Sequence, residues 1–307
     1  MKNNTFYHYF IPVLILFLPS CFGPTQSYPA IQQIIFISSR FGANMEIYTM
    51  DRDGNNQINL TKHQSWDTDP QFSPSGSGLL FITNRDGLDE IYYAELEWYG
   101  GYTRYEITNQ VNVSNHPAYD GQPQFSPDGS NIVFQSARDS TYEIYLVDVD
   151  GNNLANISNH SANDQDPQFS PDGQNILYVS DRDGDDEIFI MAINGANPMN
   201  ITNNTKPERR PRYSPTGEKI VFESARDGNY EIYSMDVDGS NQINLTNNPA
   251  FDWKPQFSPS GDKILFESTR DGNYELYIMD TDGNNLVNLT NNLGKDFGGN
   301  FAPDGSS

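Results

Sequence analysis

Apolar and polar positions alternate along this chain in short segments, without the spacing of a helix. Residues 231–235 (Glu-Ile-Tyr-Ser-Met) show the alternation of a β-strand, with aromatic and β-branched side chains that pack well between sheets. Apolar runs at residues 132–136 and 264–268 have the length of strands, and turns rich in Pro, Gly and Asp-Gly separate the segments. With 18 Tyr, 18 Phe, 24 Gly and 19 Pro, and no long stretch of helical period, the chain is predicted to be all-β.

One unit recurs along almost the whole sequence. The motif PQFSPxG or a close variant begins at residues 70, 123, 167, 211 and 255, and a degenerate copy, GNFAPDG, begins at residue 299. Four successive spacings are 44 residues and the first is 53. Each motif is followed by an apolar run, a turn such as RDGNY, a segment such as EIYSMDVDG and then NxxNLT, so the unit is predicted to be four short strands.

A single four-stranded sheet cannot bury both of its faces, whereas several sheets packed around an axis can. Residues 34–61 supply the second, third and fourth strands of a unit without the first, and GNFAPDG supplies a first strand without the rest. We therefore predict a six-bladed β-propeller of four-stranded antiparallel blades. The C-terminal first strand is expected to close the ring by joining the three N-terminal strands.

The N-terminus has the pattern of an export signal. Residues 1–21 contain Lys2, an apolar core from Phe10 to Leu18, and Cys21. That core is about half of the ~20 residues that span a bilayer, which favours a signal peptide. Because Leu18, Ser20 and Cys21 resemble a bacterial lipobox, we expect lipidation at Cys21, with a simple cleaved signal peptide as the alternative. Residues 22–30 would be a tether, and 31–307 a single propeller domain.

The charge balance excludes some partners. The formal net charge is -23, from 18 basic and 41 acidic residues, so nucleic acid and anionic lipid headgroups would be repelled. Contact with a membrane is expected only through the lipid anchor. Cations, basic protein patches and neutral polymers such as carbohydrate remain as partners, and the acidity can also serve solubility alone.

The repeats resemble those of TolB-type propellers, which read approximately as PxFSPDG, a strand, a turn, EIYxMDxDG and NxxxLT. The resemblance extends from Ile34 to Gly305 and implies a propeller of the bacterial cell envelope, periplasmic or at the cell surface. TolB itself carries an α/β domain ahead of its propeller, and about ten residues separate Cys21 from the first strand here. Related propellers precede serine peptidase domains, but the chain has no GxSxG motif. We expect a propeller alone.

Residues that recur in every blade are expected to hold the blade together. Arg and Glu flank the turn between the second and third strands, where structural pairs or turn caps are expected: Arg85/Glu90, Arg138/Glu143, Arg182/Glu187, Arg226/Glu231 and Arg270/Glu275. Similarly, His63, His116 and His160 occupy the position at which the other units have Asn, so a role in a turn is favoured over a zinc site.

One carboxylate per unit stands five residues before the aromatic residue of the motif, where the chain enters the innermost strand. These ring carboxylates are Asp67, Asp120, Asp164, Glu208, Asp252 and Asp296. They are expected to form an acidic ring at one mouth of the central channel. They would either accept hydrogen bonds from their own turns or bind Ca²⁺ or a basic side chain of a partner.

Other candidate site residues break the repeat. Asp181, Asp183 and Asp185, in the most acidic turn, are the alternative cation site; no cofactor is expected to be required, and Ca²⁺ is the metal that such ligands would bind. Two further groups are expected at the rim of the channel, where aromatic and cationic side chains suit a protein, a carboxylate or a sugar: Trp66, Tyr119 and Trp253, and Arg209, Arg210 and Arg212.

These features favour a monomeric, non-catalytic binding or scaffolding module that engages an envelope protein or peptide through the channel mouth. The alternatives are a glycan-acting lyase or hydrolase that uses two ring carboxylates, and a Ca²⁺-dependent binding protein. An enzyme of this kind needs two carboxyl groups roughly 5 to 9.5 Å apart with at least one shifted pKa.

Overall fold

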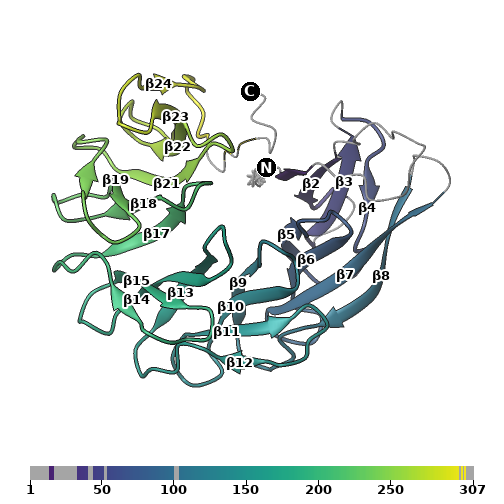
Figure 1. Cartoon of the computed structure of the whole chain (residues 1–307). Coiled ribbons are helices and arrows are strands. Elements are labelled where there is room, and N and C mark those ends of the chain that lie inside the picture. Colours follow the sequence, from purple (N-terminus) through teal and green to yellow (C-terminus); the bar gives the residue numbers. More distant parts are fainter. Residues whose placement is uncertain are drawn as a thin grey trace, which may run out of the picture.

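The chain folds into six four-stranded antiparallel sheets arranged as blades around a central axis (Figure 1). The computed structural model describes residues 14–16, 33–40, 44–51, 54–99, 104–296, 299 and 301. All regular elements in these ranges are strands, and none of the described segments is a helix that could span a membrane. The predicted all-β, six-bladed architecture is confirmed.

The strands follow one another in chain order within each blade. The first blade has β1 (Leu14–Leu16), β2 (Gln33–Ser38), β3 (Glu46–Asp51) and β4 (Ile58–Asn59). The second has β5 (Asp67–Phe72), β6 (Gly78–Thr83), β7 (Glu90–Tyr99) and β8 (Arg104–Asn112). The third has β9 (Asp120–Phe125), β10 (Asn131–Ser136), β11 (Glu143–Asp148) and β12 (Ala155–Asn156). The fourth has β13 (Asp164–Phe169), β14 (Asn175–Ser180), β15 (Glu187–Ala192) and β16 (Met199–Asn200). The fifth has β17 (Glu208–Tyr213), β18 (Lys219–Ser224), β19 (Glu231–Asp236) and β20 (Ile243–Asn244). The sixth has β21 (Asp252–Phe257), β22 (Lys263–Ser268), β23 (Glu275–Asp280) and β24 (Val287–Asn288).

The innermost strand of each blade from the second to the sixth contains a β-bulge. In the fifth blade the register against β18 shifts between Arg209 and Arg212. The residue before the motif proline adopts a positive φ at each bulge, although none of these residues is glycine: Asp69, Gln122, Asp166, Arg210 and Lys254. Proline cannot donate to the ladder, so it is tolerated at a bulge. The bulge thus sets four kinds of side chain, aspartate, glutamine, arginine and lysine, at five equivalent points of the inner strands.

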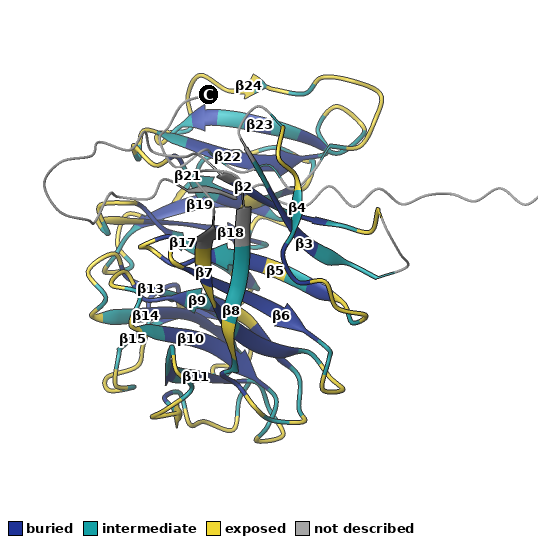
Figure 2. Cartoon of the chain, turned by 90° about the vertical axis from the view of Figure 1, so that its right-hand side faces the viewer, coloured by how far each residue is buried: buried dark blue, intermediate teal, exposed yellow. Residues whose placement is uncertain are grey.

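Apolar side chains are buried between neighbouring blades (Figure 2). Between the second and third blades, Leu80 and Ile91 pack with Phe125 and Phe134 in one cluster. Equivalent clusters fill the other four interfaces from the first blade to the sixth. Each sheet therefore shields the next, and truncating a buried phenylalanine would cost roughly 3 to 5 kcal/mol.

The strand beside β2 is β1, which comes from the segment predicted to be a signal peptide. Leu14 pairs with Ile35, and Leu16 pairs with Gln33. An unpaired strand edge accepts a short apolar segment of the same chain, which explains this pairing physically. The sequence had assigned this position to GNFAPDG, most of which lies outside the described residues, as do Cys21 and residues 22–30.

Two described C-terminal residues nevertheless make the contacts of a first strand. Asp296 donates its backbone N–H to the carbonyl of Tyr274 (2.7 Å), and Gln256 Nε2 donates to the carbonyl of Gly299 (2.6 Å). The same two contacts join the second and third blades, where Asp120 N–H reaches Asp89 and Gln71 reaches Pro123. Asp296 and Gly299 therefore contact the sixth blade as the equivalent residues of the other repeats contact the blade before them.

We predict that deletion of residues 295–307 lowers the melting temperature substantially, because the contacts of Asp296 and Gly299 with the sixth blade are lost. Thermal unfolding followed by circular dichroism measures this, with deletion of residues 305–307 alone as the control. An unchanged melting temperature after the longer deletion would contradict a structural role for this segment.

Candidate functional site

The ring carboxylates are buried ion-pair partners. The side chains of Asp67, Asp120, Asp164, Glu208 and Asp252 are all 0% exposed. Each accepts from the arginine that lies 18 residues further along the chain, at 2.9 to 3.2 Å: Arg85, Arg138, Arg182, Arg226 and Arg270. These carboxylates therefore do not face solvent as an open acidic surface.

Each arginine is held in place by the aromatic rings of its own blade. The guanidinium carbon of Arg182 lies 4.8 Å from the ring centre of Phe189 and 5.5 Å from that of Tyr178. Arg182 Nε also donates to Ser180 Oγ at 2.9 Å. A planar guanidinium satisfies a carboxylate, a hydroxyl and two aromatic faces together, which a lysine could not do.

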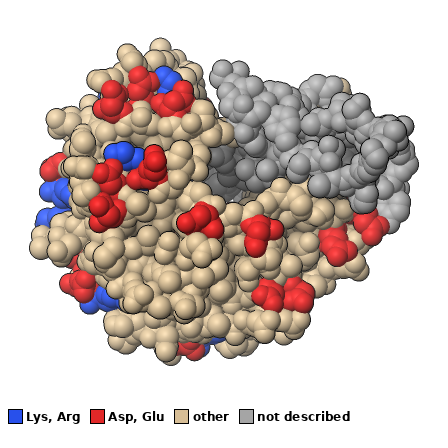
Figure 3. Space-filling model, viewed as in Figure 1, with Lys and Arg blue, Asp and Glu red and all other residues tan. Residues whose placement is uncertain are grey.

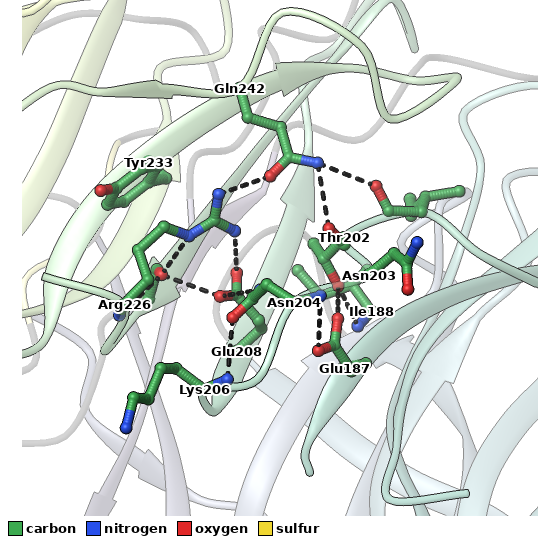
Figure 4. A network of polar contacts seen from close by, with 12 residues as sticks. Glu187, Ile188, Thr202, Asn203, Asn204, Lys206, Glu208, Arg226, Tyr233 and Gln242 are labelled. Carbon is green, nitrogen blue, oxygen red and sulfur yellow. Dashed lines mark hydrogen bonds and ion pairs between the residues drawn. The ribbon is translucent and has the colours of Figure 1, made fainter. Parts of the chain in front are cut away.

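The ring residues also join neighbouring blades. Glu208 donates its backbone N–H to the carbonyl of Asp186 in the preceding blade at 2.6 Å. Its carboxylate accepts from Arg226, Ser224 and Asn204, while burial raises its pKa and Arg226 opposes that rise. Figure 4 shows Arg226 between Glu208 and Gln242, whose amide reaches the carbonyls of Ile201 and Thr202 in the fourth blade. The backbone N–H of each buried ring residue thus links its blade to the preceding one, while its carboxylate pairs with an arginine of its own blade.

The recurring glutamates cap turns and do not pair with the arginines. Glu187 accepts from Thr202 Oγ1 at 2.5 Å and from the backbone N–H of Asn204 at 2.9 Å (Figure 4). The predicted turn caps are therefore present, whereas the predicted partner of each arginine was wrong, because the guanidinium turns inward to the ring carboxylate. The histidines also act in turns, since Nδ1 of His160 accepts from the N–H of Ala162 just as Asn204 Oδ1 accepts from Lys206.

The sixth ring carboxylate differs from the others. Asp296 is half-buried and accepts from Asn292 Nδ2. In the first blade, the arginine at the repeat position of Arg85, Arg138, Arg182, Arg226 and Arg270 is Arg40. Its guanidinium carbon lies 5.0 Å from the ring centre of Phe36 and 4.8 Å from that of Tyr48, so it contacts two aromatic rings as the other arginines do. The described residues Asp296 and Arg40 form no ion pair with each other.

The candidate cation ligands of the 181–187 turn bond to amides. Asp181 accepts from the backbone N–H and side chain of Asn163, both at 2.8 Å, and Asp183 accepts from Asn200 at 2.9 Å. Asp185 lies in the same turn and is half-buried. Within the described ranges, no group of three or more His, Cys, Asp or Glu residues is arranged to hold a metal ion.

The predicted rim aromatics are not one cluster. Trp66 is 54% exposed on the second blade. Tyr119 contacts Tyr142 edge to face, with ring centres 6.0 Å apart. Trp253 is stacked between Phe251 and Tyr274, at 5.5 and 5.4 Å. The structure therefore places these three side chains on separate blades. The indole ring of Trp253 is already stacked with two other aromatic rings.

A cavity of about 380 Å³ lies in the central channel beside the sixth blade. Its wall includes Arg210 and Arg212 of β17, Lys254 and Gln256 of β21, and Gln122 of β9. The remaining lining residues come from the sixth blade and the C-terminal segment: Pro255, Leu265, Phe266, Glu267, Leu276 and Gly299. Because the third and sixth blades are opposite in a ring of six, the cavity crosses the channel. None of the ring carboxylates lines it.

The lining of this cavity is basic although the protein is acidic. Three cations and one carboxylate contribute to it, whereas the whole chain carries a formal charge of -23. Figure 3 shows scattered acidic groups on the visible described surface, which outnumber the basic ones. The cavity lining therefore attracts an anionic group, unlike the acidic protein as a whole.

The predicted cluster of three arginines separates in the structure. Arg209 is exposed and pairs with Asp186 at 2.8 Å, outside the cavity. Arg210 pairs with Glu223, whose charge raises the pKa of the guanidinium despite its burial. Lys254, which sequence reasoning missed, joins Arg210 and Arg212 in the cavity, and its ammonium group contacts Glu267 at 3.1 Å.

We predict that Asp164→Asn lowers the free energy of unfolding by about 3 to 5 kcal/mol, because it leaves the Arg182 charge buried without its partner. The control is Asp236→Asn, which removes the exposed pair with Lys219 and should cost about 1 kcal/mol or less. Urea denaturation measures both. Equal, small losses in the two variants would show that the ring pairs do not hold the blades.

Comparisons with known proteins agree with this architecture. The family described as the TolB beta propeller domain matches residues 102–209 and 200–307. The chain is 31% identical over 119 residues to a protein named TolB homolog from Chlorobaculum tepidum, an alignment that covers 39% of this chain and 25% of that protein.

Two solved structures show the same fold. TolB from Acinetobacter baumannii superposes with a TM-score of 0.60 at 22% identity, over 83% of this chain and 63% of that one. A puromycin hydrolase superposes with a TM-score of 0.64 at 13% identity, over 84% of this chain and 45% of that one. The chain thus spans less than two thirds of the length of each of these proteins. The family match extends over more than half of the sequence, and the chain therefore belongs to the TolB β-propeller domain family.

Proposed function

We propose that this protein is a non-catalytic binding module of the bacterial cell envelope that holds a protein or peptide in its central channel. The observation that carries the proposal is the contrast between the repeated and the unrepeated positions. The ring carboxylates repeat and are buried in ion pairs. The side chains at the bulges differ from blade to blade, and three of them, Gln122, Arg210 and Lys254, line the channel cavity. Such a wall suits recognition of one partner in one orientation.

Membership of the TolB propeller family supports a place in the envelope and a protein partner. We further propose export by the N-terminal signal, with lipidation at Cys21 and a monomeric state. Cleavage before Cys21 would remove β1 and leave the edge of β2 free for the first strand that the repeat predicts there, GNFAPDG. A rigid ring of blades suits this role, because little conformational entropy is lost when a partner enters a preformed channel.

The alternative of a glycan-acting enzyme has less support. It needs two carboxyl groups near one pocket, one of them with a shifted pKa. Burial and the neighbouring Asp89 raise the pKa of Asp69, but Asp69 does not line the cavity, and Glu267 is the only carboxylate in the lining of that cavity among the described residues. A solvated pair of acid and base is therefore not assembled there.

We predict that Gln122→Lys reduces capture of the partner at least tenfold in pull-downs from envelope extract. Lysine already occupies the equivalent bulge position at Lys254, so the fold should tolerate the change while the longer side chain narrows the channel and removes the amide group of Gln122. The matched control is Gln174→Lys, on an exposed turn outside the cavity, which should capture the same proteins as the native chain.

Equal capture by the two variants would contradict binding in the channel. Loss of capture by both native protein and control in the presence of a calcium chelator would instead favour the Ca²⁺-dependent alternative.

A further inference from the structure

Along the channel, the repeat is broken between the fifth and sixth blades. At the motif position after proline, four blades carry glutamine and the fifth carries arginine: Gln71, Gln124, Gln168, Arg212 and Gln256. At the fifth position of the second strand, three blades carry an aliphatic residue, one carries glutamine, and the fifth and sixth carry glutamate: Ile37, Ile82, Gln135, Val179, Glu223 and Glu267. Both departures fall at the same sector of the channel.

The glutamines at this position connect neighbouring blades. Gln124 Oε1 accepts from the backbone N–H of Phe169 at 2.8 Å, and Gln168 Oε1 accepts in the same way from Tyr213 at 3.0 Å. Arginine has no acceptor atom, so Arg212 cannot make this link to Phe257 in the sixth blade. Phe257 is correspondingly half-buried, whereas Phe169 and Tyr213 are buried. The substitution therefore weakens a structural contact at the place where the cavity lies.

Of the three cationic side chains that line the cavity, two form ion pairs with carboxylates and Arg212 forms none with a described residue. Arg210 pairs with Glu223 at 2.9 Å, and Lys254 pairs with Glu267 at 3.1 Å. Arg212 is half-buried, and its Nη1 donates to the carbonyl of Pro211 at 2.8 Å. No carboxylate of the described residues lies within ion-pair distance of its guanidinium. A half-buried guanidinium in such a setting attracts an anionic ligand.

We propose that Arg212 binds a carboxylate of the peptide partner, either its C-terminus or an acidic side chain, in the cavity of about 380 Å³. The proposal rests on the function proposed above and names the group that is recognised. A singly charged carboxylate fits better than a phosphate, because Glu223 and Glu267 lie close by and would repel a second negative charge. Glu267 and Gln122, which line the cavity from the sixth and the third blade, offer acceptors and donors for the amide groups of a peptide.

The test compares two small probes, N-acetyl-alanyl-alanine with a free carboxylate and the same dipeptide as its C-terminal amide. Binding to the purified full chain is measured by NMR titration. Hydrogen bonds to a charged group contribute about 1.5 to 3 kcal/mol, so the carboxylate should bind roughly tenfold or more tightly than the amide.

The decisive variant is Arg212→Gln, which restores the residue of the other four blades and so should keep the melting temperature unchanged or raise it. It should abolish the preference for the carboxylate. Arg209→Gln is the matched control, because Arg209 lies outside the cavity and pairs with Asp186. The control should keep the preference.

Equal binding of the two probes to the native chain would overturn the proposal, as would retention of the preference in Arg212→Gln. Tighter binding of inorganic phosphate than of the carboxylate probe would overturn the choice of ligand. Partner capture that depends on Gln122 but not on Arg212 would overturn this inference while leaving the proposed function standing.

Discussion

The fold depends on the buried ring carboxylate that five of the six blades contain, which has no access to water. An ionised carboxyl group at 0% exposure is stable only when a cation and hydrogen-bond donors surround it. This protein meets that requirement with an arginine from the same blade, two aromatic rings and a hydroxyl group. The backbone of the ring residue is bonded to the preceding blade at the same time. The ion pair therefore holds the ring residue within its own blade, while its backbone hydrogen bond and the apolar clusters join that blade to the one before it.

This arrangement separates structure from function along the channel. The polar groups of residues that recur in every blade already form ion pairs and hydrogen bonds within the protein. Few of these groups are therefore available to bind a ligand. The fold does not require a particular residue type at the bulge, two residues after each ring carboxylate. Aspartate, glutamine, arginine and lysine therefore all occur at this position. Chemistry for a partner is therefore expected where the units differ along the channel, as they do around Arg212.

Much of the fold could be predicted from the sequence, because the repeat reports both the strands and their number. The equivalence of His160 and Asn204 in turns was also visible in the spacing. The environment of the ring carboxylates could not be predicted from the spacing. Whether Arg182 pairs with Asp164 or with Glu187 depends on the direction in which the turn orients the arginine side chain. For the same reason Arg209, Arg210 and Arg212 looked like one cluster. The change from glutamine to arginine at 212 was a signal that could have singled it out.

The most direct test is a crystal structure of the protein with N-acetyl-alanyl-alanine bound. The probe carboxylate is expected to contact the Arg212 guanidinium, while the ring carboxylates stay buried against their arginines and do not touch the ligand. A probe bound at the ring carboxylates, or stacked on the rim aromatics Trp66 or Trp253, would contradict the separation of repeated structure from unrepeated function.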